Sequence, residues 1–116
     1  MTADFASTQQ VFDDTLGATV ENARTSGGYI RYLQVSNPNT AQGFLQLFNA
    51  AAADVTLATT VPTQSYLIPA GDGVSRGSFE LTVPIHFNTA ISYAFTTTTT
   101  GAGGLTSNGA LNMVLY

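Results

Sequence analysis

Residues 29–49 read YIRYLQVSNPNTAQGFLQLFN, two runs of alternating apolar side chains joined by a polar segment. Because successive side chains of a strand point to opposite faces, each run predicts a β-strand. Pro38 removes a ladder donor, and the Asn and Gly residues around it favour turns, so the polar segment ends the first strand. We therefore expect two antiparallel strands, with Leu33 and Val35 on the core face of the first.

The second run carries large apolar side chains on both faces. Leu45 and Leu47 share one face, and Phe44 and Phe48 share the other. A strand of this kind is either central in its sheet or covered by a partner. Since a thin sandwich has little room for a second apolar layer, we expect Phe44 and Phe48 to lie in a partner or oligomer interface.

The remainder of the chain repeats this pattern. No helical period separates the alternating runs, which excludes a parallel α/β sheet. The Gly-rich segment 101–109 is expected to be a flexible hairpin loop. Residues 28–116 are therefore predicted to form one all-β domain, a single antiparallel β-sandwich or jelly roll of about seven to eight strands. The further strands are expected over 64–69, 77–83, 90–100 and 110–116.

The first 27 residues differ from the rest of the chain. They hold most of the acidic residues, and their large apolar side chains, Phe5, Val11, Phe12 and Leu16, are scattered among polar ones. Such a segment offsets its ordering entropy only by burying those side chains in a groove. We predict an extended N-terminal arm over 1–27 whose four apolar side chains bind a neighbouring subunit or another protein.

Two alternatives stay open for this segment. Residues 18–23 favour a first strand of the sandwich itself, before the turn at Ser26-Gly27-Gly28. Residues 7–16 allow a helix with Ser7 as its N-cap, although their apolar residues are sparse for an amphipathic helix.

Composition excludes several classes of partner and site. The 116-residue chain has no cysteine and no lysine, which excludes disulfides, thiolate metal sites and lysine chemistry. A net charge of -4 provides no basic stripe for nucleic acid or for an anionic membrane surface. The N-terminal residues lack the basic and apolar regions of a secretory signal, and no apolar run is long enough to predict a membrane span.

Residue types that often carry chemistry are isolated in this sequence. His86 is the single histidine, without a second imidazole or an arranged nucleophile, and is interpreted as a bend residue. Asp13, Asp14 and Asp72 lack the spacing of a calcium loop and are interpreted as turn residues. The glycines of 101–104 are not followed by a helix N-terminus suited to phosphate. We therefore predict no enzymatic activity, no metal and no cofactor.

The tyrosines allow a second interpretation. Exposed aromatic rings can form stacking platforms for sugars, whereas tyrosines that alternate in strands mainly pack within sheets. A carbohydrate site is therefore kept as the alternative. The candidates are Tyr29, Tyr32, Tyr66, Tyr93 and Tyr116.

Five segments together carry a resemblance to a known family. They are YLQVSN (32–37), FLQLFN (44–49), LIPAGDGV (67–74), HFNTAISYAF (86–95) and LNMVLY (111–116). These segments resemble a small β-sandwich family that recurs among virion proteins of tailed bacteriophages. The likeness covers about residues 28–116 and consists of strand and turn patterns. The segment 101–109 lacks the acidic residues expected there, and residues 1–27 match no part of that family.

The resemblance implies a non-enzymatic virion component. It implies a capsid decoration or cement protein that binds the major capsid protein or another virion protein and stabilises the head. It further implies a homo-oligomer, with a trimer favoured, made in the host cytoplasm and located on the capsid surface. The alternative is a receptor- or carbohydrate-binding module of a tail or fibre. Uniform coverage of the head would indicate decoration, and a few copies at the tail tip would indicate adhesion.

Overall fold

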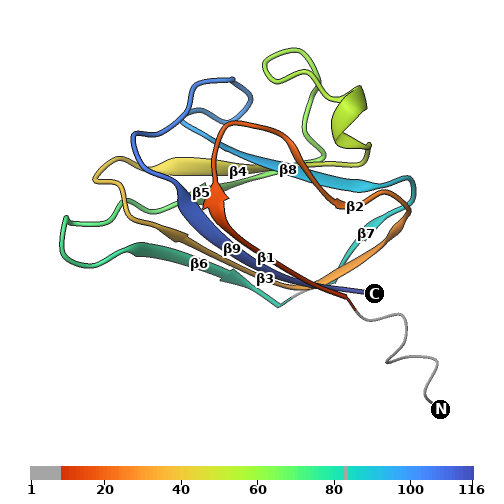
Figure 1. The fold of residues 1–116 in the computed structure, drawn as a ribbon, viewed down its shortest axis with the longest axis horizontal. Helices are drawn as coiled ribbons and strands as arrows, with labels where there is room; N and C mark the ends of the chain where they lie inside the picture. The colour runs from red at the N-terminus through yellow and green to blue at the C-terminus, as the bar shows by residue number, and fades with distance from the viewer. Residues whose placement is uncertain (1–8, 83) are drawn as a thin grey trace.

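The computed structural model describes residues 9–82 and 84–116, and within them it confirms an all-β fold (Figure 1). The strands expected beyond residue 28 are present, and a single helical turn lies between the fourth and fifth strands of the described chain. The elements are β1 (Gln9–Leu16), β2 (Glu21–Arg24), β3 (Gly28–Asn37), β4 (Gly43–Phe48), the 3-10 helix η1 (Ala52–Asp54), β5 (Gln64–Ile68), β6 (Gly77–Leu81), β7 (Ile85–Phe87), β8 (Ile91–Thr96) and β9 (Gly109–Leu115).

The strands form two antiparallel sheets, which lie as separate layers in Figure 1. Sheet A has the order β1-β9-β3-β6, with β7 also paired to β3, and sheet B has the order β2-β8-β4-β5. β6 pairs with residues 33–37 of β3, and β7 pairs with residues 28–30. β6 and β7 therefore act as one interrupted strand along the same edge of β3.

The pairing of the strands is nested. β1 pairs with β9, β2 with β8, β3 with β6 and β7, and β4 with β5. The first half of the chain thus runs antiparallel to the second half, as one long hairpin folded over into two sheets. This is the topology of a jelly roll, so the structure selects the jelly roll from the two expected all-β architectures.

The core fills the space between the inner faces of the two sheets. The predicted core residues Leu33 and Val35 are fully buried, as are the alternating apolar side chains of β8 and β9. Each large apolar side chain buried in this way contributes about 1.5 to 3 kcal/mol to folding. The buried cluster comprises Leu16, Ala23, Ile30, Leu33, Val35, Leu45, Leu47, Ile68, Phe87, Ile91, Tyr93, Phe95, Leu111, Met113 and Leu115.

A β-bulge changes the alternation at the start of β3. Strict alternation places Ile30 opposite Leu33, yet both are buried in the core. The register of β3 against β9 shifts between Ile30 and Tyr32, so one extra residue is accommodated on β3. As a result Arg31 and Tyr32 both lie outside the core, because a bulge re-aims the side chains next to it.

The predicted arm is wrong over the described part of residues 1–27. β1 pairs with β9 and β2 with β8, so both belong to the sandwich. Leu16 is 1% exposed within the core, and β1 is a strand rather than the helix considered for 7–16. The alternative, a first strand of the sandwich over 18–23, is confirmed as a strand, and its bounds are Glu21–Arg24. Phe5, the first proposed anchor, lies outside the described residues.

The described N-terminal residues form a strand of the sandwich because the backbone of β9 needs hydrogen-bond partners on this edge. Without β1, one edge of β9 would present a row of unpaired N–H and C=O groups. β1 satisfies these groups through its backbone from Gln9 to Leu16, apart from an irregularity after Asp13. A strand held by its backbone needs few apolar side chains, and so apolar spacing alone does not reveal it.

A carboxylate joins the two sheets near β1. Asp13 Oδ1 accepts from the backbone and hydroxyl of Thr15 at 2.9 and 3.0 Å, and Asp13 Oδ2 accepts from the Tyr93 hydroxyl at 2.9 Å. Burial of the phenol and its hydrogen bond to Asp13 raise the pKa of Tyr93 well above the ordinary value of 10.0. β1 of sheet A is thereby tied to β8 of sheet B.

We expect Tyr93→Phe to lower the free energy of unfolding by about 1.5 kcal/mol, because it removes a hydrogen bond to a charged, partly buried carboxylate. Urea unfolding at neutral pH measures this change. Tyr32→Phe is the matched control, since the Tyr32 hydroxyl donates to Glu80 Oε2 at 2.8 Å on the surface of sheet A. An equal effect of both substitutions would contradict a special role for the bond between the sheets.

The raised pKa of Tyr93 also predicts a pH dependence. The unfolded chain ionises this phenol near the ordinary value of 10.0, whereas the folded chain keeps it protonated at higher pH. The stabilising contribution is therefore complete below that pH and decreases as the pH rises above it. Between about pH 9 and about pH 11, the wild type should lose more unfolding free energy than Tyr93→Phe. Parallel pH profiles for the two proteins would exclude this contribution.

Candidate functional site

The outer face of sheet B is covered by the chain itself over β4 and β8, while Leu67 at the β5 edge is 47% exposed. In Figure 1 the connection from β4 to β5 and the connection from β8 to β9 rise beside this sheet. Ser92 Oγ donates to the carbonyl of Ala50 at 2.7 Å, and Gln46 Nε2 donates to the carbonyl of Gly101 at 3.0 Å. These bonds to loop carbonyls allow polar side chains of β4 and β8 to be buried without loss of most of their hydrogen bonding.

The prediction that Phe48 lies in a partner interface is therefore wrong. Phe48 is 1% exposed, lies outside the core cluster and pairs across β4 and β8 with the buried Ser92. Phe44, on the same face, is half-buried. The second apolar layer expected of β4 exists, but the long connections of the same chain cover it.

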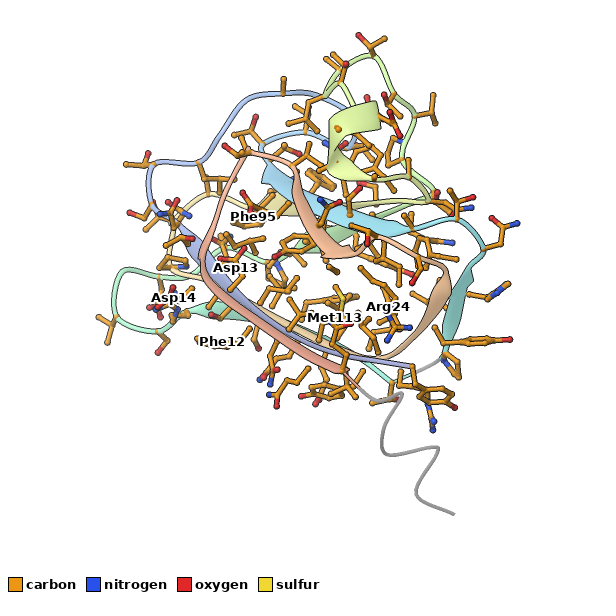
Figure 2. All side chains as sticks on the ribbon, turned by 45° about the vertical axis from the view of Figure 1, so that its right-hand side comes forward. Phe12, Asp13, Asp14, Arg24, Phe95 and Met113 are labelled. Atoms are coloured by element: carbon orange, nitrogen blue, oxygen red, sulfur yellow. The ribbon has the colours of Figure 1, made fainter. Side chains whose placement is uncertain are left out.

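The outer face of sheet A remains open in the described part of the chain. Phe12 is 67% exposed, Tyr29 42% and Tyr116 40%. Figure 2 shows Phe12 directed away from the sandwich, whereas Phe95 and Met113 lie between the sheets. We call this surface the aromatic face. It comprises Phe12, Tyr29, Arg31, Tyr32, Gln34, His86, Asn112, Val114 and Tyr116.

Strand register places these side chains on one surface. The β9 residues Asn112 and Val114 alternate with the buried Leu111, Met113 and Leu115, so they face outward, and Tyr116 continues this alternation directly after β9. Cross-strand partners on the same face follow from the pairing. They are Phe12 and Gln34 beside Asn112, Tyr32 beside Val114, and Tyr29 between Tyr116 and His86.

One end of the aromatic face is a compact cluster of three rings and one guanidinium group. The Tyr29 ring centroid lies 4.7 Å from that of His86 and 6.0 Å from that of Tyr116. The Arg31 guanidinium carbon lies 4.1 Å from the Tyr116 ring centroid. We call these four residues the tyrosine cluster. It draws on β3, β7 and the residue after β9, and the bulge in β3 directs Arg31 towards it.

The other end of the face combines a prominent ring with a depression. Phe12 borders a shallow cavity of about 180 Å³, together with side chains of β3 and β9. Among the predicted arm anchors, Phe12 alone is exposed within the described residues. Val11 is half-buried against the core and Leu16 is inside it, so neither is available to a partner. A partner contact by Phe12 stays a prediction.

A second cavity lies at the end of the sandwich between two connections. It has a volume of about 390 Å³ and is bounded by the β3–β4 and β8–β9 connections. The buried Asn39 shapes it: its side chain donates to the Ser107 carbonyl at 2.9 Å and accepts from the Ser107 N–H at 2.8 Å. The lining residues, all uncharged, are Pro38, Asn39, Thr40, Ala41, Thr97, Gly104, Leu105, Thr106 and Ser107.

The other sequence candidates have structural positions of their own. His86 lies within β7 and not at a bend, so that interpretation is wrong. Asp72 Oδ1 accepts from the N–H groups of Val74 and Ser75 at 2.9 and 2.6 Å, which confirms a turn residue and lowers the Asp72 pKa. Residues 101–109 connect the two sheets and are therefore not a hairpin loop.

Within residues 9–82 and 84–116, no group of three or more His, Asp or Glu side chains could hold a metal ion. None of the helical segments in this part of the chain is long and apolar enough to cross a membrane.

The corrected position of Phe48 can be tested by truncation. Phe48→Ala should lower the free energy of unfolding by about 3 to 5 kcal/mol, because it leaves a cavity under the connecting loops. Phe12→Ala should change it by well under about 1 kcal/mol, because an exposed ring loses little on truncation. Denaturant unfolding of both variants measures the difference. A mild effect of Phe48→Ala would show that its covering loops open readily in solution.

Comparison with known proteins does not extend these findings. No family model matches the chain, and no curated protein matches it.

Proposed function

We propose that this chain is a non-enzymatic structural protein of a bacteriophage virion, a decoration or cement protein that binds the head surface and stabilises it. The observation that carries this proposal is the difference between the two outer faces. The chain covers β4 and β8 of sheet B with its own loops and leaves Leu67 exposed at the β5 edge, while sheet A presents three aromatic rings, Phe12, Tyr29 and Tyr116, to solvent. An open face rich in aromatic residues is typical of a surface that meets a protein partner.

The chemistry of the aromatic face suits a protein lattice. Tyrosine, phenylalanine and arginine are enriched where proteins bind one another, since they bury a large area at little entropic cost. Only 9% of the chain is charged, so electrostatic repulsion between closely spaced copies is weak. The major capsid protein or another virion protein is the proposed partner, with neither nucleic acid nor a membrane involved.

The jelly-roll topology and the resemblance support the same proposal. Jelly rolls recur in viral capsid and lectin domains, although a fold alone does not determine a function. The family that the strand segments resemble narrows this choice to a virion component. Synthesis in the host cytoplasm and final location on the capsid surface follow from the proposal.

Assembly into a homo-oligomer, with a trimer favoured, is part of the proposal. Phe48 no longer provides a physical reason for it, because this side chain is buried within one chain. Phe12 provides a new one, since a ring that is 67% exposed beside a shallow depression can pack against a second copy. Light scattering on the isolated protein and on particle-bound material tests the oligomeric state.

A carbohydrate- or receptor-binding module of a tail or fibre is the second candidate function. The uncharged cavity of about 390 Å³ favours it, because hydroxyl and amide groups line a space large enough for a small saccharide. Copy number per particle separates the two functions. Uniform coverage of the head supports decoration, and a few copies at the tail tip support adhesion.

We expect Phe12→Ser to weaken binding to purified heads by at least about tenfold, the loss that about 1.4 kcal/mol at a hot-spot residue produces. Cosedimentation of the protein with heads lacking it measures the affinity. Val61→Ser is the matched control, since Val61 is 82% exposed on the connection that covers sheet B. Equal binding by wild type and Phe12→Ser would contradict docking through the aromatic face.

A further inference from the structure

Groups that can carry positive charge are concentrated at one end of an acidic molecule. The chain has a net charge of -4 and contains three arginines and one histidine. Arg31 and His86 belong to the tyrosine cluster, and the Arg24 guanidinium lies next to Gly28 at the start of β3. Arg76 precedes β6 at the opposite end of the sheet, where Gly77 pairs with Asn37. The tyrosine cluster therefore holds one of the three arginines and the histidine, and Arg24 lies at the same end of the molecule.

The acidic groups of sheet A lie away from this cluster or are already occupied. Glu80 pairs across from Gln34 and accepts the Tyr32 hydroxyl at 2.8 Å. Asp14 belongs to the last part of β1, whereas Gln9 at the start of that strand pairs near the cluster. The main-chain oxygen of Tyr116 accepts the backbone N–H of Tyr29, with Arg24 nearby. None of these groups forms a recorded ion pair with Arg31 or His86 in the described chain.

The arrangement of the rings indicates the kind of ligand. The Tyr29 ring lies between His86 and Tyr116, and Arg31 covers one face of Tyr116. Sugar recognition by stacking uses an open ring face, whereas each ring here has a neighbouring ring or guanidinium group beside it. The four side chains also carry donors: two phenol hydroxyls, the guanidinium N–H groups and the imidazole. None of these donors makes a side-chain hydrogen bond within residues 9–82 and 84–116.

We propose that the tyrosine cluster binds an acidic protein segment, with carboxylate side chains of the partner accepting from Arg31 and from the hydroxyls of Tyr29 and Tyr116. Arginine presents a planar fork of donors that matches a carboxylate. The contact between the Arg31 guanidinium and the Tyr116 ring positions this fork before binding. This identification of the partner rests on the proposed function, in which the segment belongs to the protein of the head surface.

Hexaglutamate is the probe for the site itself, and hexaglutamine at equal ionic strength is its control. The ¹⁵N-labelled protein is titrated with each peptide, and chemical shifts are followed at Arg31, His86 and Tyr29. Hexaglutamate should shift these resonances, and added salt should weaken the effect because exposed charges are screened. Arg31→Gln should abolish the response, and Arg76→Gln, at the opposite end of the sheet, should retain it.

Cosedimentation with purified heads tests whether the same site is used in assembly. Arg31→Gln should bind heads at least about tenfold more weakly than wild type, whereas Arg76→Gln should bind equally well. Both substituted side chains are exposed, and the thermal unfolding midpoints of the variants serve as the folding control. Equal binding of heads by wild type and Arg31→Gln would overturn the proposal that a head protein supplies the acidic segment.

The outcomes of the two experiments are separable. Absence of a hexaglutamate response at the tyrosine cluster would overturn the acidic-segment site even where the protein binds heads. A response at the cluster in a wild-type protein that does not bind heads would support the site and overturn the decoration function. A tighter response to polygalacturonate than to hexaglutamate would overturn the proposal in favour of an acidic saccharide.

Discussion

The pairing of β9 with both of its neighbours is the constraint on which the rest of the structure depends. β9 lies between β1 and β3, and its inward side chains Leu111, Met113 and Leu115 are fully buried. Its backbone therefore needs hydrogen-bond partners on both edges, and these come from the beginning of the described chain. Such distant pairing closes long loops before burial compensates for their entropy, which makes a jelly roll a slowly folding topology. In the nested hairpin, β9 forms the outermost of the four pairs with β1 and also joins that pair to β3.

Sequence patterns identify the strands that bury one apolar face. They miss strands that are ordered mainly by backbone hydrogen bonds to a neighbour. Alternation correctly predicts β6, β8 and β9, whose inward side chains are apolar at every second position. It misses β1 because backbone hydrogen bonds to β9, and not side-chain burial, order that strand. It also misassigns Phe48, because the cover of an outer face depends on where the long connections run. Hydrogen bonds such as that from Gln46 to Gly101 form only after the fold has placed the loop.

The candidate site likewise contains one residue that the sequence identifies and a cluster that it does not. Phe12 is identifiable from the sequence as a large apolar side chain among polar ones, although the reason given there, a detached arm, is incorrect. The tyrosine cluster is not identifiable, since Tyr29, His86 and Tyr116 meet only through the register of three strands. The five tyrosines separate into two groups for this reason. Tyr66 and Tyr93 pack towards the core, and the other three lie on the aromatic face.

The bulge in β3 connects the core to this face. Ile30 and Leu33 are both buried although three positions separate them, which a regular strand does not permit. The extra residue that resolves this conflict forces Arg31 and Tyr32 outward together. Arg31 then lies over the ring of Tyr116, the residue after β9. The packing demand of two core side chains thus fixes the position of the one arginine in the tyrosine cluster, and a change in that packing would alter the surface chemistry without any substitution on the surface.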